Sequence, residues 1–151
     1  MKRSNLTLER FAASTVAVLH ALVAVTHGGP VAVPDVSAYL SVAQWVHGGV
    51  LPAELAFHPG YGFVLSPFGA FNGSTLHTLA LICNGALAAL CVLLAAGLAR
   101  RLNGPPWTIR IAIIVAAVHP ALSSSSRVAW PETLLAVIVM SAALVLTSSR
   151  W

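Results

Sequence analysis

Apolar residues occur in long blocks along this chain, and short polar or turn-forming segments separate the blocks. The blocks cover residues 11–26, 75–99, 109–122 and 131–146. A helix needs about 20 apolar residues to cross the hydrocarbon core of a bilayer. The pattern predicts an all-α, polytopic membrane helical bundle with about four spans, formed by residues 1–151 as a single transmembrane domain.

The segment between the first two blocks has a different pattern. Apolar residues recur at helical spacing over residues 36–46 and stop at Gly48, which is typical of an amphipathic helix on the membrane surface. Residues 61–71 are apolar but too short to span, so they predict a re-entrant or tilted half-helix. We expect Asp35 to be the N-cap of the surface helix and Ser74 to be the N-cap of the next long helix.

The first apolar block allows two interpretations. Basic residues precede it and small residues follow it, as in a cleaved signal peptide. No Ala-x-Ala cleavage site follows, however, and further apolar blocks come later. We therefore favour an uncleaved first transmembrane helix.

Charged residues are scarce, and their distribution indicates an orientation. They make up 8% of the chain, against roughly 25% in an average soluble domain. With about four spans, most basic residues fall on one side of the membrane: Lys2, Arg3, Arg10, Arg100, Arg101, Arg110 and Arg150. The positive-inside rule makes that side cytoplasmic, together with the N-terminus. Because these residues bracket apolar blocks and do not alternate with aromatics, the net charge of +4 does not indicate a nucleic-acid partner.

The outer side then holds the carboxylates Asp35, Glu54 and Glu132 and one cation, Arg127. Asp35 is the strongest candidate for chemistry, because a carboxylate beside a membrane surface can act as a general base or hold a divalent cation. Its alternative role is that of a plain helix cap. Arg127 can bind a lipid phosphate, and its alternative is to anchor the loop, paired with Glu132.

The segment from His58 to Gly62 is a further candidate. Its proline and two glycines predict a rigid loop that permits close approach, with His58 and Tyr61 as polar groups. A structural turn is the alternative.

Six histidines and two cysteines raise the alternative of a haem or metal site. No short ligand spacing supports such a site, so we interpret His20 and His119 as helix-packing residues. Cys83 and Cys91 are about 12 Å apart along one predicted helix, which is too far for a disulfide.

Together these motifs resemble the amino-terminal part of the GT-C superfamily of polyprenyl-phosphate-sugar-dependent glycosyltransferases, particularly bacterial mannosyltransferase-like members. The matching pattern begins with an outer loop that contains Asp35-x-x-x-Tyr39, followed by a surface helix that ends in two glycines. The segment 58–71 and a helix that opens with residues 126–132 complete it.

The resemblance implies a glycosyltransferase of the bacterial plasma membrane that takes its sugar from a polyprenyl-phosphate donor. It makes Asp35 the catalytic base that deprotonates the acceptor hydroxyl. Substrate binding is assigned to five further residues: Tyr39, His58, Tyr61, Arg127 and Glu132. Members of the family often carry a second acidic residue beside the first, where this chain has Val36.

Members of this family have many more helices than four. The chain is therefore expected to be a fragment, a truncated product or one part of a split enzyme, completed by a C-terminal portion or by another membrane subunit. Since one carboxylate does not position two substrates, the chain alone is expected to be inactive or nearly so. The rival interpretation is a small non-enzymatic membrane protein that packs against a larger partner, which would bury the short apolar segments.

Overall fold

The computed structural model describes residues 2–26, 34–50, 59–119, 128–129 and 131–148. Every regular element within these residues is a helix, which confirms the all-α class. The four most apolar helices are α1 (Lys2–Thr26), α4 (Gly73–Arg101), α5 (Pro106–Val118) and α7 (Glu132–Ser148). Three others form a separate group, namely α2 (Pro34–Val46), α3 (Gly60–Leu65) and the 3-10 helix η1 (Ser66–Phe68).

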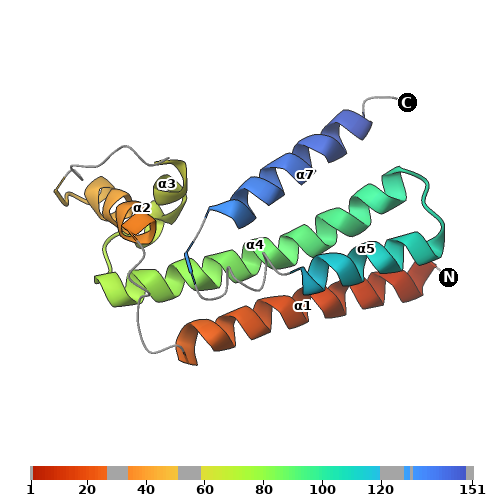
Figure 1. Cartoon of the computed structure of the whole chain (residues 1–151), viewed down its shortest axis with the longest axis horizontal. Helices are drawn as coiled ribbons and strands as arrows, with labels where there is room; N and C mark the ends of the chain where they lie inside the picture. The colour runs from red at the N-terminus through yellow and green to blue at the C-terminus, as the bar shows by residue number, and fades with distance from the viewer. Residues whose placement is uncertain (1, 27–33, 51–58, 120–127, 130, 149–151) are drawn as a thin grey trace.

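Helix α4 is the element on which the others pack. Its 29 residues contact α1, α5, α7 and α2. Figure 1 shows α1 running antiparallel to α4, with α5 beside both, while α2 and α3 lie at the N-terminal end of α4. Helix α7 starts near the middle of α4 and diverges from it, and its C-terminal end lies at the same end of the molecule as the N-terminal end of α1 (Figure 1).

Helices α1 and α4 approach closely where Gly85 faces His20. A Cβ atom added at Gly85 would lie 2.6 Å from the Cβ of His20, so only glycine permits this distance. The His20 ring nitrogen Nδ1 lies 2.9 Å from the carbonyl oxygen of Val16, which supports the predicted packing role. Toward the other end, the buried Glu9 forms an ion pair with Arg100 and ties the two helices in register.

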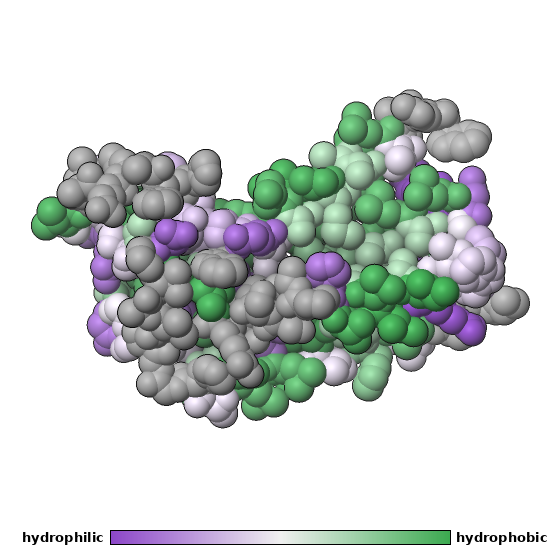
Figure 2. Space-filling model, viewed as in Figure 1, coloured by the Kyte–Doolittle hydropathy of each residue, from purple (hydrophilic) through white to green (hydrophobic). Residues whose placement is uncertain are grey.

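Among the described residues, two helices are long and apolar enough to cross a membrane by length and composition, Thr7–Thr26 of α1 and the whole of α4. Helices α5 and α7 have 13 and 17 residues, fewer than the roughly 20 that a span needs, so the number of spans stays a prediction. Figure 2 shows hydrophobic surface over α5 and α7. Exposed large apolar side chains occur on all four of these helices, among them Val18, Leu19, Leu90, Leu93, Ile111, Ile114, Ile138 and Val139.

The first residues of helices α2 and α4 contradict two predicted N-caps. Helix α2 begins at Pro34, so Asp35 lies within its first turn and the predicted N-cap role is wrong. A carboxylate in the first turn still stabilises the helix through its interaction with the helix dipole. Helix α4 is capped by Asn72, whose Oδ1 accepts from the Thr75 amide at 2.9 Å, and not by Ser74. Helix α7 starts at Glu132, one residue after the start of the predicted block at residue 131.

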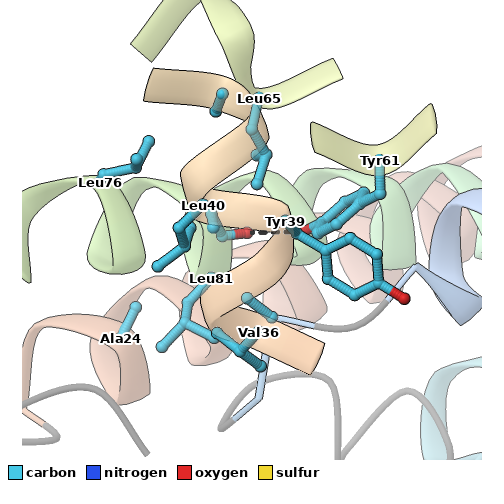
Figure 3. Packing of buried hydrophobic residues seen from close by; sticks show 11 residues of the cluster. Ala24, Val36, Tyr39, Leu40, Tyr61, Leu65, Leu76 and Leu81 are labelled. Atoms are coloured by element: carbon cyan, nitrogen blue, oxygen red, sulfur yellow. Dashed lines mark hydrogen bonds between the residues drawn. The ribbon is translucent and has the colours of Figure 1, made fainter. Parts of the chain in front are cut away.

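The group of α2, α3 and η1 is held together by close backbone packing. Gly62 lies against Val42, where an added Cβ would come within 2.6 Å of the valine Cβ, and Gly69 lies against the backbone of Ala43. Buried apolar side chains join this group to α4, as Leu40, Leu65, Leu76 and Leu81 do in Figure 3. The predicted half-helix is therefore present as α3 and η1, packed under α2.

The contact at Gly85 yields a matched pair of variants in one helix. Gly85→Ala is expected to lower stability by about 1–3 kcal/mol, because the new methyl group meets the backbone-attached Cβ of His20. Gly97→Ala is expected to be neutral or stabilising, because its Cβ would meet only the flexible tip of Leu144, at 3.2 Å, and alanine favours the helix. Thermal unfolding in detergent, followed by circular dichroism, measures both. Equal midpoints would contradict the tight α1–α4 contact.

Candidate functional site

The site is a groove between the α2/α3 group and the start of α7. Its volume is about 520 Å³, and its walls come from three elements. Tyr39 of α2 and Tyr61 of α3 form one side, and Glu132 with the apolar side chains that follow it in α7 forms the other. We call it the outer groove.

The two tyrosines of the chain pack against each other in this groove. Their ring centroids are 5.5 Å apart and their planes meet at 87°, the edge-to-face arrangement that aromatic pairs favour. Both side chains are buried, at 5% exposure for Tyr39 and 2% for Tyr61. Figure 3 shows the rings side by side, beside the apolar cluster that seats α2 and α3 on α4.

A hydrogen-bonded amide fixes Tyr61. Its hydroxyl donates to Asn84 Oδ1 in the middle of α4, at 2.7 Å. Asn84 Nδ2 in turn donates to the carbonyl oxygen of Val128 at 3.3 Å, close to the start of α7. Asn84 is fully buried, and an unpaired amide would be costly there. The amide therefore joins α3, α4 and the segment leading into α7.

Two carboxylates act on Tyr39 from different parts of the chain. Burial raises the pKa of the Tyr39 phenol, and the negative charges of Asp35 and then Glu132 raise it further, since both disfavour a phenolate. Burial likewise raises the pKa of Tyr61. Asp35 lies one helical turn before Tyr39 and is half-buried, whereas Glu132 reaches the same ring through the tertiary fold.

The structure thus brings together four of the six predicted site residues: Asp35, Tyr39, Tyr61 and Glu132. Asp35 acts on Tyr39 without lining the outer groove itself. His58 and Arg127 lie outside the described residues. So does Glu54, the third carboxylate expected on the outer side.

A metal site was one of the open alternatives. Within the described residues, no group of three or more His, Cys, Asp or Glu side chains is placed to hold a metal ion. Asp35 and Glu132 can hold Mg²⁺ only together with other ligands, such as substrate phosphate oxygens. The divalent cation therefore stays a prediction.

Asn84 and Thr133 were not among the predicted site residues. Asn84 had a detectable signal, because a polar residue in the middle of an apolar helix usually faces other helices, but its partners Tyr61 and Val128 are distant in sequence. Thr133 is the second residue of α7 and lines another groove together with Glu132. A threonine in a helical first turn has no pattern that marks it.

The Tyr61–Asn84 hydrogen bond can be tested by a double-mutant cycle. Asn84→Ala is expected to destabilise the chain by about 1–3 kcal/mol, because the buried Tyr61 hydroxyl loses its short hydrogen bond and keeps only the longer one to the Ala80 carbonyl oxygen, at 3.5 Å. The further substitution Tyr61→Phe should lower stability much less in the Asn84→Ala variant than in the wild type. Thermal unfolding in detergent provides the four values. Additive costs would contradict the coupling.

The electrostatic contacts of Tyr39 can be tested by alkaline titration. Asp35→Asn and Glu132→Gln are each expected to lower the pKa of Tyr39, because each removes a negative charge that disfavours the phenolate. The chain has only two tyrosines, so phenolate absorbance in the ultraviolet follows them directly. Ser41→Ala, in the same helix, serves as the control. An unchanged titration in Glu132→Gln would show that α7 does not approach Tyr39.

No family model, curated protein or solved structure matches this chain. The chemistry that the site can perform therefore follows from its own residues.

Proposed function

We propose that this chain is a membrane-embedded unit that binds a polyprenyl-phosphate sugar and supports transfer of the sugar to an acceptor hydroxyl, as the resemblance to GT-C glycosyltransferases implies. The observation that carries the proposal is that Glu132 and two tyrosines line one groove beside apolar helices, with Asp35 close enough to Tyr39 to raise its pKa.

Membrane placement is supported by the two long apolar helices and by the outward-facing apolar side chains of α1, α4, α5 and α7. Arg100 and Arg101 end α4, and Arg110 lies near the start of α5, so these cations gather at one end of the bundle. With the positive-inside rule that end is cytoplasmic. The α2/α3 group at the opposite end of α4 then lies toward the outer face (Figure 1).

The outer groove suits a sugar with an attached lipid. Carboxylates accept hydrogen bonds from several hydroxyl groups, and Glu132 lines the groove. Tyr39 and Tyr61 provide apolar ring surface.

Leu134, Leu135 and Ile138 continue the wall of the outer groove along α7 and offer contact to the apolar chain of the lipid. Arg127 and His58, which the resemblance assigns to substrate binding, lie outside the described residues, so their roles stay predictions.

Asp35 serves as the base in the proposed reaction. Its carboxylate takes the proton from the acceptor hydroxyl, whose oxygen forms a bond to the anomeric carbon of the sugar. The bond from that carbon to the phosphate oxygen breaks, and polyprenyl phosphate leaves with the bonding electron pair. General base catalysis of this kind contributes about 10²–10⁴-fold, and the remaining rate depends on positioning by further helices of the same chain or of another subunit.

A non-enzymatic role beside a larger membrane partner is the second candidate. The observation that favours it is the length of α5 and α7, which have 13 and 17 residues and whose ends are easier to satisfy inside protein than in lipid. This role predicts that the chain binds no sugar donor.

Donor binding separates the two candidates. The full chain in lipid nanodiscs is expected to bind radiolabelled polyprenyl-phosphate mannose more tightly than polyprenyl phosphate without the sugar. Tyr39→Ala should weaken binding of the mannosylated lipid by roughly tenfold, because it removes a ring of the groove. Asp35→Asn should bind within about threefold of the wild type and lower transfer by about 100-fold or more in membranes that support it.

The matched control is Trp45→Ala, which removes a partly exposed aromatic residue of the same helix and lies outside the outer groove. Its donor binding should equal that of the wild type. Absence of any preference for the mannosylated lipid would contradict the proposed function, and undiminished transfer by Asp35→Asn would remove Asp35 as the base.

A further inference from the structure

A second groove lies between α4, α5 and α7, and we call it the inner groove. Its volume is about 390 Å³, within the range of small-molecule sites. Five of the ten described lining residues are small: Cys91 and Ala95 of α4, Ala112 and Ala116 of α5, and Ala136 of α7. Because these residues are short and apolar, they leave space suited to a hydrocarbon chain. His119, at the end of α5, also lines the groove.

One polar group in this wall has no hydrogen-bond partner within the described part of the chain. Thr133 lines the inner groove and is 2% exposed. Its Oγ1 atom is buried and unpaired, although its backbone oxygen lies near the Cys91 sulfur, at 4.0 Å. A buried hydroxyl without a partner is unfavourable. The hydroxyl therefore points to a ligand that brings its own polar atom.

The neighbouring side chains restrict the chemistry of that polar atom. Glu132 precedes Thr133 and also lines the inner groove. An ionised carboxylate only accepts hydrogen bonds, whereas a threonine hydroxyl both donates and accepts. A ligand hydroxyl satisfies both residues, since it accepts from Thr133 and donates to Glu132. A ligand carboxylate would be repelled by Glu132, and a plain hydrocarbon would leave Thr133 unpaired.

We propose that the inner groove binds a long-chain alcohol, with its hydroxyl between Thr133 and Glu132 and its chain against the alanines of α5 and α7. This inference goes beyond the proposed sugar transfer, because it requires neither Asp35 nor the two tyrosines. Among the residues that the structure describes, only Glu132 lines both grooves, so a ligand in the inner groove places its hydroxyl beside the outer one.

Binding of two probes that differ only in the hydroxyl tests the proposal. Native mass spectrometry of the full chain counts bound 1-dodecanol and bound dodecane at equal mole fraction in the micelle. One molecule of 1-dodecanol is expected to bind per chain, roughly tenfold more tightly than dodecane, from the hydrogen bonds made to buried groups. Thr133→Val keeps the shape of the side chain and should bring the ratio close to one.

Two alanine positions in α7 provide the matched controls. Ala136→Phe fills the inner groove and should abolish binding of both probes, whereas Ala142→Phe, on the exposed face of the same helix, should change neither. Equal binding of the two probes to the wild type would overturn the proposal without any variant. A preference for the alcohol that persists in Thr133→Val, or binding that survives Ala136→Phe, would also overturn it.

Discussion

The buried amide of Asn84 is the contact on which the placement of the outer groove depends. Its oxygen accepts from Tyr61 of α3, and its nitrogen donates to the carbonyl of Val128 before α7. A fully buried amide is costly to leave unpaired, so both partners stay attached to the middle of α4. Tyr61 and Glu132 therefore face one groove although their helices hardly touch each other directly.

Glu132 has a special position because it belongs to both grooves. In the outer groove it adds to burial and to Asp35 in raising the pKa of Tyr39, and its carboxylate offers hydrogen-bond acceptors. In the inner groove it stands beside the unpaired Thr133 hydroxyl. Ligands that carry hydroxyl groups suit both settings. If both proposals hold, two ligands share one carboxylate, and occupancy of one groove changes the affinity of the other.

Local patterns explain which predictions succeeded. The apolar blocks predicted the helices, and the block that starts at residue 131 gave the start of α7 to within one residue. Pro131 and Glu132 stand at this start, where proline and acidic residues are favourable. The predictions of N-cap residues failed where several neighbouring residues could cap the same helix. Asn72 and Ser74 are both good capping residues, and the backbone conformation at Asn72 decided between them. Asp35 is the second residue of α2, two positions after the one that would cap the helix.

The sequence by itself determined the all-α class, the two long apolar helices and the short helical segment after Pro59, because these follow from local composition and periodicity. It also singled out Asp35, Tyr39, Tyr61 and Glu132 one at a time. Only the tertiary structure decided that these four meet, that Asn84 joins their helices and that Thr133 lines a second groove. Helical periodicity states which face of a helix is apolar, whereas the partner of that face depends on packing between segments far apart in the chain.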